Sequence, residues 1–309
     1  MKVLSALLCT FVCVCAVSAS VSNARAADAP DWKDNPANWR SVDPANLLLI
    51  DVAYGRIAVE LAPQFAPHHA ARVRALAKAH FYDGLSFYRV IDGFVAQGGI
   101  GEATASTAGR PISADVKKAW PPLNAEFTRP IGSDVHFTPL GSADLFAPEV
   151  GHVAGFPVGL DPKDKTMWII HCPGTFAFAR DNEANTATTE FYIVIGQAPR
   201  RLDRNLTAFG RVIAGMQYVQ KLNRGDPDVE SGVIQDPKRR DKILKARIAA
   251  DLPVGEQPHY QVMRTDTKAF SDWKDQRKNP APGFYVRTPP AILDVCLAPV
   301  PARLKPKAD

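Results

Sequence analysis

Arg89 and Gln97 are polar residues in an otherwise apolar and aromatic stretch, F-Y-D-G-L-S-F-Y-R-V-I-D-G-F-V-A-Q-G-G at 81–99. A guanidinium stays charged at physiological pH and carries several hydrogen-bond donors in a rigid fork. Arginine is rarely buried without a partner. An arginine among aromatic residues is therefore either paired in a salt bridge or part of a binding site.

Two short strands must position these side chains. Asp92-Gly93 separates the runs Ser86–Ile91 and Phe94–Gly98, and Asp-Gly between alternating apolar runs predicts a hairpin because glycine accepts a positive φ. Side chains alternate along a strand, so every second residue shares a face. The expected shared faces are Phe87, Arg89 and Ile91 on the first strand, and Phe94 and Ala96 on the second.

Other reactive residue types do not form a recognisable site. The chain has no G-x-S-x-G, H-E-x-x-H or paired-carboxylate signature, which argues against a hydrolase. His68, His69 and His80 are expected to be surface residues without a metal, because helix neighbours point about 100° apart and no carboxylate completes a ligand set. His171 and Cys172 are adjacent, so on a strand they face opposite sides and do not suit a nucleophile and its base.

The stretch 81–99 closely resembles the most specific block of the cyclophilin family of peptidyl-prolyl isomerases, F-Y-D-G-x-x-F-x-R-V-I-x-G-F-x-x-Q-G-G. The resemblance continues in order over roughly 45–250. G-T-F-A-F-A at 174–179 leads through a polar loop to E-F-Y-I-V-I at 190–195, and the loop begins with the Ala-Arg of bacterial members. R-L-D-R-N-L-T-A-F-G-R-V at 201–212 aligns without a gap on the family's x-L-D-x-x-x-x-x-F-G-x-V.

The resemblance implies a mainly β fold, a closed eight-stranded antiparallel barrel capped by two helices. The sequence patterns support several of its elements. Residues 46–52 and 55–61 form an expected strand pair, with Ile57, Val59 and Leu61 on one face, and apolar residues recur at helical spacing within 63–80. A second short helix is expected at 216–222 and the closing strand at 241–249.

Three segments lie outside this expected barrel at 45–250. An extended lead-in occupies 27–44. The piece at about 128–172 shows no clear periodicity and is long for a loop, so it is either a functional flap or an insertion. The extension at 251–309 is rich in proline and charge but also holds aromatic residues, so we expect it to pack on the barrel.

The resemblance also assigns a site. Arg89 is the implied catalytic residue, Phe94, Val95, Tyr192 and Leu202 line an apolar proline pocket, and Gln97 binds the substrate backbone. The backbone of Ala179 and Arg180 is expected to pair with the extended peptide as an added strand does. The implied substrate-binding residues are Phe94, Val95, Gln97, Ala179, Arg180, Glu190, Phe191, Tyr192, Leu202 and Leu206. Neither a cofactor nor a metal ion is implied.

Five positions depart from the common family pattern. Tyr88 stands where many members have His, and Val95 stands where Met is common. Glu190 replaces a Gln and is expected to pair with Arg89 or Arg180. The other two replace residues familiar from cyclosporin-sensitive members: Arg201 stands for Trp and Leu206 for His. The missing Trp predicts weak cyclosporin binding.

The N-terminal residues predict a signal peptide. Lys2 precedes an apolar run at 3–16, and Ala24-Arg25-Ala26 is a small-x-small cleavage site, so residues 1–26 are expected to be removed. Of the five cysteines, only Cys172 and Cys296 would remain, and the sequence does not decide whether they pair or are buried as small hydrophobes. We expect an exported protein, periplasmic or secreted.

Composition limits the partners. The net charge of +5 is spread over 309 residues without a dense basic stripe, so nucleic-acid binding is not favoured. No later run is long and apolar enough for a membrane span, and a monomer is expected. Two functions are compatible: an isomerase that acts on proline-containing exported polypeptides and assists their folding, or a proline-peptide-binding or chaperone-like module with little turnover. Tyr88, Glu190 and Leu206 motivate the second.

Overall fold

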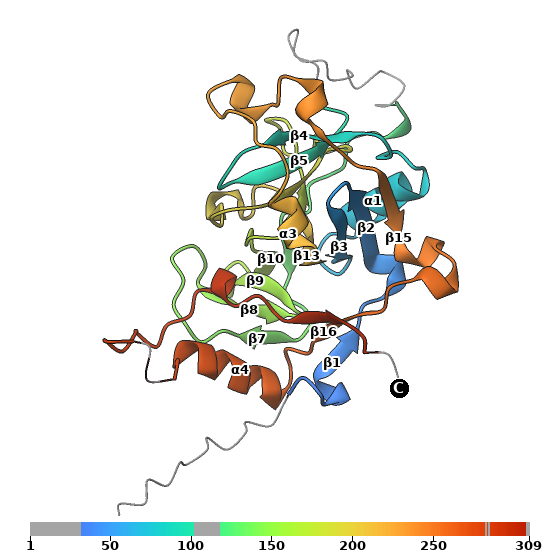
Figure 1. The fold of residues 1–309 in the computed structure, drawn as a ribbon. Coiled ribbons are helices and arrows are strands. Elements are labelled where there is room, and N and C mark those ends of the chain that lie inside the picture. Colours follow the sequence, from blue (N-terminus) through green and yellow to red (C-terminus); the bar gives the residue numbers. More distant parts are fainter. Residues whose placement is uncertain (1–31, 102–117, 282, 284, 307–309) are drawn as a thin grey trace, which may run out of the picture.

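The computed structural model describes residues 32–101 and 118–306, apart from 282 and 284. The described part is mainly β, with three antiparallel sheets of nine, five and three strands (Figure 1). Within it, no helix has the length and apolar character needed to cross a membrane. The predicted signal peptide lies outside the described residues.

The nine-stranded sheet forms the centre of the molecule and carries most of the expected strands. Its order is β14-β4-β5-β12-β11-β13-β3-β2-β15. The bounds are β2 Leu47–Val52, β3 Gly55–Leu61, β4 Ser86–Val90, β5 Val95–Gly99, β11 Thr175–Phe178, β12 Phe191–Val194, β13 Ala208–Ala214, β14 Asp241–Lys242 and β15 Lys245–Ile248. The predicted hairpin at 86–98 is confirmed as β4 and β5, with Gly93 at φ 69° in the turn.

The expected closed eight-stranded barrel is wrong. The sheet is curled but open, because no ladder joins its described edge strands β14 and β15. Both edges come from the segment expected as the closing strand. Its first part pairs with β4 and its second part with β2, while Ile243 N–H donates to Leu85 O and Leu244 N–H to Asp51 O, both at 2.8 Å. One segment therefore bridges two edges that do not pair with each other.

Two helices cover the apolar interior of the curled sheet. Helix α1, Pro67–Lys78, begins with its proline at the first turn and buries Ala70, Val73 and Leu76. Helix α3, Met216–Val219, is shorter than the predicted 216–222. The strand pair β2–β3 supplies Ile57, Val59 and Leu61 to the same interior, as their alternation predicted.

His69 is not a surface residue. Its side chain is fully buried, and its Nδ1 lies 2.7 Å from the Glu126 carboxylate, which also accepts the backbone N–H groups of His68 and His69 at 3.1 and 3.0 Å. The N-cap residue of α1, Ala66, has no side chain able to do this. Glu126 therefore caps the helix from a distant part of the chain. Burial opposes ionisation of Glu126, but these hydrogen bonds outweigh it and lower its pKa.

The piece at 128–172 folds into the five-stranded sheet. The order is β6-β10-β9-β8-β7, with β6 Arg129–Pro130, β7 Phe137–Pro139, β8 Glu149–Val153, β9 Phe156–Asp161 and β10 Thr166–Ile169. Residues such as Phe156, Leu160 and Met167 pack with Val95 and Val194 of the central sheet. Strands β8 to β10 are buried on both faces, so they show no alternation that would predict them.

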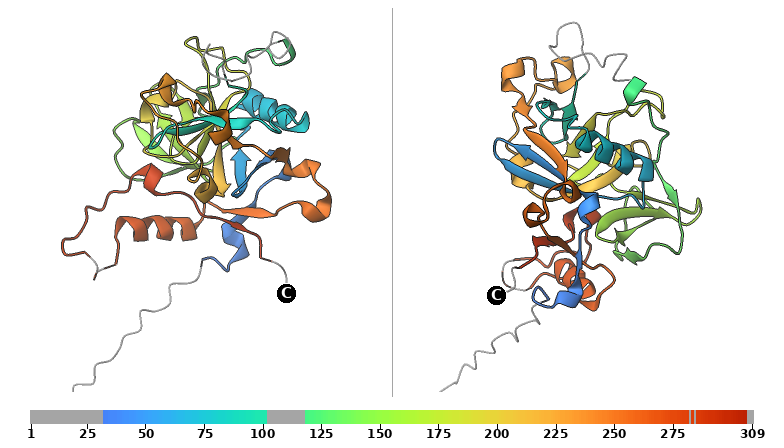
Figure 2. Two further views of the ribbon diagram at one scale, coloured as in Figure 1. Left: turned by 45° about the horizontal axis from the view of Figure 1, so that its top comes forward. Right: turned by 90° about the vertical axis from the view of Figure 1, so that its right-hand side faces the viewer.

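The third sheet joins the two ends of the described chain. It consists of β1 Trp39–Ser41, β16 Tyr260–Met263 and β17 Ala302–Leu304. Helix α4, Lys268–Lys278, follows β16 and lies beside β7 and β8, where Phe270 contacts His152 with ring centroids 5.2 Å apart. In all views these elements lie at one end of the molecule (Figures 1 and 2). A disulfide bond joins Cys172 to Cys296 and ties this region to the end of the second sheet.

Candidate active site

A cavity of about 510 Å³ opens on the surface of the central sheet where β4, β5 and β12 lie side by side. The residues expected at the site, except Phe191, line it. The lining consists of Tyr88, Arg89, Phe94, Val95, Gln97, Pro122, Ala179, Arg180, Asp181, Thr186, Thr188, Glu190, Tyr192, Leu202, Leu206, Glu230, Ser231 and Val233. Residues from six separate stretches of sequence thus converge on one hollow.

Cross-strand pairing brings the central three residues together. Arg89 of β4 pairs directly with Gln97 of β5, and Gln97 pairs with Tyr192 of β12. Directly paired residues of antiparallel strands point to the same face. Arg89, Gln97 and Tyr192 therefore form a row across the sheet, with the cation at one end and the aromatic ring at the other.

A bulge makes this row possible and corrects the expected faces. The β4–β5 register shifts between Phe87 and Arg89, so that Phe87 pairs with Gly98 and Arg89 with Gln97. A bulge places an extra residue, here Tyr88, on one strand and reverses the alternation. Phe87 is consequently buried in the interior while Arg89 faces the cavity. Phe94 and Ala96 do not share a face either. Phe94 precedes β5 and lines the cavity, whereas Ala96 is in the interior.

Arg89 has no acidic partner among the described residues. Its Nε donates to the Ser231 carbonyl oxygen at 2.8 Å and its Nη1 to Gln97 Oε1 at 3.1 Å. In the part of the chain that the structure describes, nothing accepts a hydrogen bond from its Nη2. Burial lowers the pKa of Arg89, but an arginine remains charged. Two neutral acceptors thus fix the guanidinium and leave one arm of the fork for a ligand.

Tyr88 orients Gln97 from the side opposite Arg89, and Glu190 in turn contacts Tyr88. Gln97 Nε2 donates to the Tyr88 hydroxyl at 2.5 Å, which leaves Oε1 to face Arg89. Tyr88 is nearly buried, and burial together with the Glu190 carboxylate raises its pKa well above 10. Glu190 is itself buried, which raises its pKa, although hydrogen bonds from Tyr88 and from the Ile100 and Gly101 amides oppose the shift.

Glu190 does not pair with Arg89 or Arg180, contrary to the expectation. Its Oε1 accepts the Ile100 N–H at 2.9 Å and its Oε2 the Gly101 N–H at 3.3 Å. The Arg180 guanidinium instead donates to the carbonyl oxygens of Asn205, Asp181 and Asn182. Glu190 thus fixes the end of β5 and Arg180 fixes its own loop, so the Glu190 carboxylate is paired with neither arginine.

The apolar wall of the cavity consists of Phe94, Val95, Tyr192, Leu202 and Leu206. Behind this wall lies the five-stranded sheet, because Val95 and Tyr192 belong to the cluster that holds the buried side chains of β8, β9 and β10. The segment 128–172 therefore supports the cavity from behind rather than covering its opening.

Phe191, expected among the substrate-binding residues, does not line the cavity. It alternates with Tyr192 along β12 and points to the opposite face, where it is 1% exposed. Its ring stacks on Phe176 with centroids 5.1 Å apart and meets Phe87 and Tyr82 edge to face. Phe209 of β13 is in the same interior cluster.

The backbone of Ala179 and Arg180 is only partly available to an added strand. Both residues line the cavity, but the Ala179 N–H already donates to the Glu190 carbonyl oxygen at 2.8 Å. The expected strand-like pairing with substrate can therefore not use this donor. Among the described residues, no cluster of three or more His, Cys, Asp and Glu side chains could hold a metal ion.

The sequence did not reveal two contributors to the site. Ser231, whose carbonyl oxygen accepts from Arg89, follows Glu230, and their φ values of 54° and 46° lie in a region that costs non-glycine residues roughly 1–3 kcal/mol. A backbone acceptor leaves no trace in side-chain patterns. The second contributor, His171, lies behind Tyr192 with its Nε2 2.9 Å from the hydroxyl oxygen. Only the tertiary packing brings His171 and Tyr192 together.

Comparisons with known proteins identify the family of this chain. The family model described as "Cyclophilin type peptidyl-prolyl cis-trans isomerase/CLD" matches residues 47–248. A "Probable peptidyl-prolyl cis-trans isomerase" of Brucella suis is 28% identical over 214 residues, which cover 68% of this chain and 86% of that protein. Peptidyl-prolyl cis-trans isomerase B of Bacillus subtilis is 49% identical over 51 residues, 16% of this chain and 36% of its own.

A solved structure extends the similarity beyond the family core. Cyclophilin AquaCyp293 from Hirschia baltica superposes with a TM-score of 0.70 at 29% identity, and the match covers 90% of this chain and 97% of that one. The structural match is wider than the family match at 47–248, so it includes residues outside that range. The chain belongs to the cyclophilin-type peptidyl-prolyl cis–trans isomerase family.

Proposed function

We propose that this cyclophilin-type isomerase rotates X–Pro bonds of exported polypeptides, with Arg89 as the donor that stabilises the twisted imide. The observation that carries the proposal is the position of Arg89. Its guanidinium lines the same cavity as Phe94 and Tyr192 and is held by two neutral acceptors instead of a carboxylate. An arginine in a salt bridge would have its charge neutralised and fewer donors left for a ligand.

The chemistry requires no bond to be made or broken. The barrier to rotation, about 18–20 kcal/mol, arises because twisting destroys amide resonance. In the twisted state the imide nitrogen becomes pyramidal and gains a lone pair, which neither planar ground state has. A donor aimed at that lone pair binds the transition state more strongly than the substrate, and this difference accelerates rotation. Arg89 Nη2, from which no described residue accepts a hydrogen bond, is a donor of the kind that this role requires.

The remaining residues hold the substrate. The wall formed by Phe94, Val95, Tyr192, Leu202 and Leu206 suits the proline ring, which is apolar and compact. Gln97 lies between this wall and Arg89 and is placed to meet the substrate backbone. No titrating group takes part in the chemistry, so we expect kcat/KM to depend little on pH across the neutral range.

A proline-limited refolding assay tests the proposal. The wild-type protein should accelerate the slow phase, and Arg89→Ala should lose most of the acceleration. The matched control is Arg264→Ala, because Arg264 is a half-exposed arginine paired with Asp266 and does not line the cavity. If wild type binds a proline peptide but does not speed refolding, the alternative of a binding or chaperone-like module is correct.

The action on exported proteins is a further part of the proposal. Two features support it: the signal peptide predicted at 1–26 and the Cys172–Cys296 disulfide bond. Disulfide bonds persist mainly in oxidising compartments, such as the periplasm or the extracellular space. Fractionation of cells that produce the full chain, followed by mass determination of the mature N-terminus, tests this. Intact Met1 in the cytosolic fraction would contradict export.

A further inference from the structure

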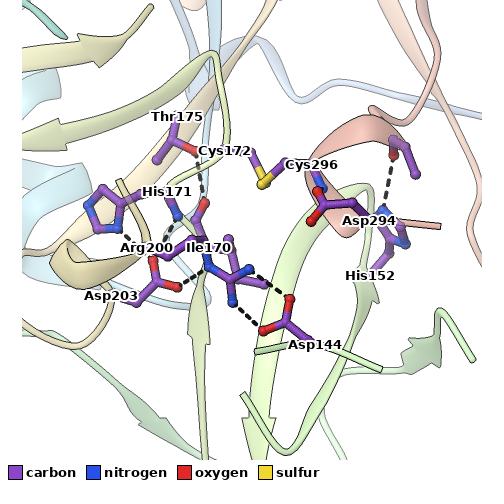
Figure 3. The surroundings of a disulfide bond; sticks show 11 residues. Asp144, His152, Ile170, His171, Cys172, Thr175, Arg200, Asp203, Asp294 and Cys296 are labelled. Carbon is purple, nitrogen blue, oxygen red and sulfur yellow. Dashed lines mark hydrogen bonds and ion pairs between the residues drawn. A yellow bond between two sulfur atoms is a disulfide. The ribbon is translucent and has the colours of Figure 1, made fainter. Parts of the chain in front are cut away.

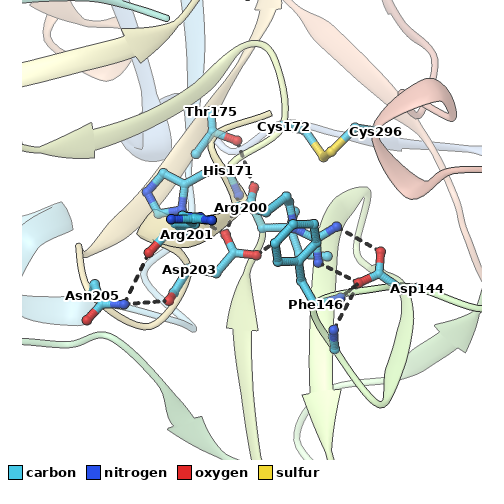
Figure 4. Close-up of polar contacts among 12 residues, drawn as sticks. Asp144, Phe146, His171, Cys172, Thr175, Arg200, Arg201, Asp203, Asn205 and Cys296 are labelled. Atoms are coloured by element: carbon cyan, nitrogen blue, oxygen red, sulfur yellow. Dashed lines mark hydrogen bonds and ion pairs between the residues drawn. A yellow bond between two sulfur atoms is a disulfide. The ribbon is translucent and has the colours of Figure 1, made fainter. Parts of the chain in front are cut away.

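A buried polar chain runs from the wall of the cavity to the segment 128–172. The Tyr192 hydroxyl lies 2.9 Å from His171 Nε2, and His171 Nδ1 lies 3.0 Å from Asp203 Oδ1. Arg200 Nε donates to Asp203 Oδ2 at 2.7 Å, and the two terminal nitrogens of Arg200 each donate to Asp144 at 2.8 Å (Figures 3 and 4). His171 is fully buried and does not line the cavity.

The donor and acceptor roles fix the orientation of the His171 ring. The Asp203 carboxylate can only accept, so Nδ1 must carry a proton and Nε2 must face the tyrosine. Asp203 Oδ1 also accepts the His171 backbone N–H at 2.9 Å, which holds the main chain and the ring to the same oxygen. The His171 and Tyr192 rings lie nearly parallel, with an interplanar angle of 15°. The hydrogen bond thus restrains the tyrosine hydroxyl, while the ring centroids lie 6.1 Å apart.

Bonds to both neighbouring residues hold the backbone around His171 in place (Figure 3). The Ile170 carbonyl oxygen accepts from Thr175 Oγ1 and from the Cys172 N–H, each at 2.9 Å. Cys172 itself is covalently bonded to Cys296. His171 therefore has little freedom to move away from the tyrosine, and the position of Tyr192 depends on residues outside the cavity.

We propose that His171 is a positioning residue of the proline pocket, which holds the Tyr192 ring in place through the tyrosine hydroxyl and is itself oriented by Asp203. The inference rests on the proposed function, because it assigns Tyr192 to the wall that receives proline. A buried tyrosine hydroxyl needs a hydrogen-bond partner, and without His171 the ring would have to turn toward another. Proline contacts Tyr192 in the planar and twisted states alike, so loss of the contact weakens substrate binding rather than the rate at saturation.

A double-mutant cycle with His171→Phe and Tyr192→Phe tests the assignment. NMR titration of a proline-containing peptide gives Kd, and exchange between its cis and trans signals gives kcat and KM. Each single variant should raise Kd and KM roughly three- to tenfold with kcat close to wild type, as expected for one lost hydrogen bond. The double variant should match the single variants, because all three lack the same contact. Tyr192→Phe removes only a hydroxyl, so it keeps the test valid if His171→Phe does not fold.

His152→Phe is the matched control. His152 is as buried as His171 and bonds to the Ala298 carbonyl oxygen at 3.2 Å, but it does not contact the cavity. The control should lower Tm and leave Kd unchanged. Unchanged Kd in His171→Phe or Tyr192→Phe, or additive effects in the double variant, would overturn the positioning role. Because Kd is read without catalysis, a protein that binds the peptide but does not isomerise it would refute the proposed function alone. If the wild-type protein does not bind the peptide, the proposed function and the positioning role are both refuted.

Discussion

The guanidinium of Arg89 is held by the Ser231 carbonyl oxygen and by Gln97 Oε1, two acceptors that carry no formal charge. These contacts use separate N–H groups of one rigid plane, which fixes the direction of the third arm. A lysine ammonium has no such plane and cannot satisfy both acceptors while still presenting a directed donor. The geometry of the fork, and not the charge alone, is therefore the feature expected to matter.

Arg89→Lys tests this point at constant charge. The variant should lose on the order of 100-fold in kcat/KM, as when a single transition-state donor is removed, with a much smaller change in peptide Kd. Cis–trans exchange measured by NMR on a proline peptide gives both quantities. Activity close to wild type would mean that a positive charge anywhere near the imide is sufficient.

Glu190→Gln tests the buried carboxylate beside Tyr88. Burial raises the folded-state pKa of Glu190, so the protonated form favours folding. The stabilisation is complete below the pKa of the unfolded chain and is lost as pH rises through the folded-state pKa. Wild type should therefore become less stable relative to the variant in urea unfolding as pH rises above the unfolded-state pKa of about 4.3. A difference that stays constant as pH rises would contradict the assignment.

Strand β8 carries a second buried titrating group, His152, between the five-stranded sheet and the C-terminal segment. Burial lowers its pKa to about 3, and the nearby charges of Arg211 and Lys274 act in the same direction. His152 is therefore protonated at a lower pH in the folded state than in the unfolded chain. The resulting stability is present above the unfolded pKa of about 6.5 and is lost as pH falls toward the folded value.

His152→Phe is expected to remove this pH dependence. Between about pH 5.5 and about pH 4, wild type should lose close to 1.4 kcal/mol of unfolding free energy per pH unit relative to the variant. Chemical denaturation at a series of pH values measures the difference. Parallel pH profiles of the two proteins would show that His152 accepts a proton in the folded state.

Local patterns predicted the elements that they alone determine. The Asp92-Gly93 turn, the strand pair 46–61 and helix α1 follow from spacing within one stretch of chain. The bulge at Tyr88 does not, because it exists only in the pairing of β4 with β5. For this reason the expected face of Phe87 was wrong, and that of Phe94 was wrong because Phe94 lies in the turn before β5. The resemblance had nevertheless named Arg89, Gln97 and Tyr192 as site residues.

At the level of the whole molecule, the support behind the site was the part least accessible from sequence. The strands of the five-stranded sheet are buried on both faces, so the usual alternation is missing. The contact of His171 with Tyr192 and the pairing of Cys172 with Cys296 join residues 21 and 124 positions apart. Such contacts depend on how the three sheets pack together, which no single stretch of sequence determines.

The disulfide bond joins the segment that follows β10 to the turn that precedes β17, and removing it tests how much the cross-link contributes to stability. Cys172 and Cys296 both pack in the cluster that includes Trp168 and Phe270. A cross-link that closes a loop of 124 residues restricts the unfolded chain strongly, and losing it should cost roughly 2–5 kcal/mol of unfolding free energy. Adding a reductant should therefore lower the Tm of wild type in thermal unfolding monitored by circular dichroism.

The variant Cys172→Ala/Cys296→Ala separates the cross-link from other effects of the reductant. It should start at a lower Tm than oxidised wild type and show no further change when reductant is added. Both cysteines are in or beside an apolar cluster, so alanine fills most of the space and leaves no polar group unpaired. If the variant and oxidised wild type unfold at the same temperature, packing of β1, β16, β17 and α4 is enough to hold the C-terminal segment, and the covalent bond adds nothing to the stability of the fold.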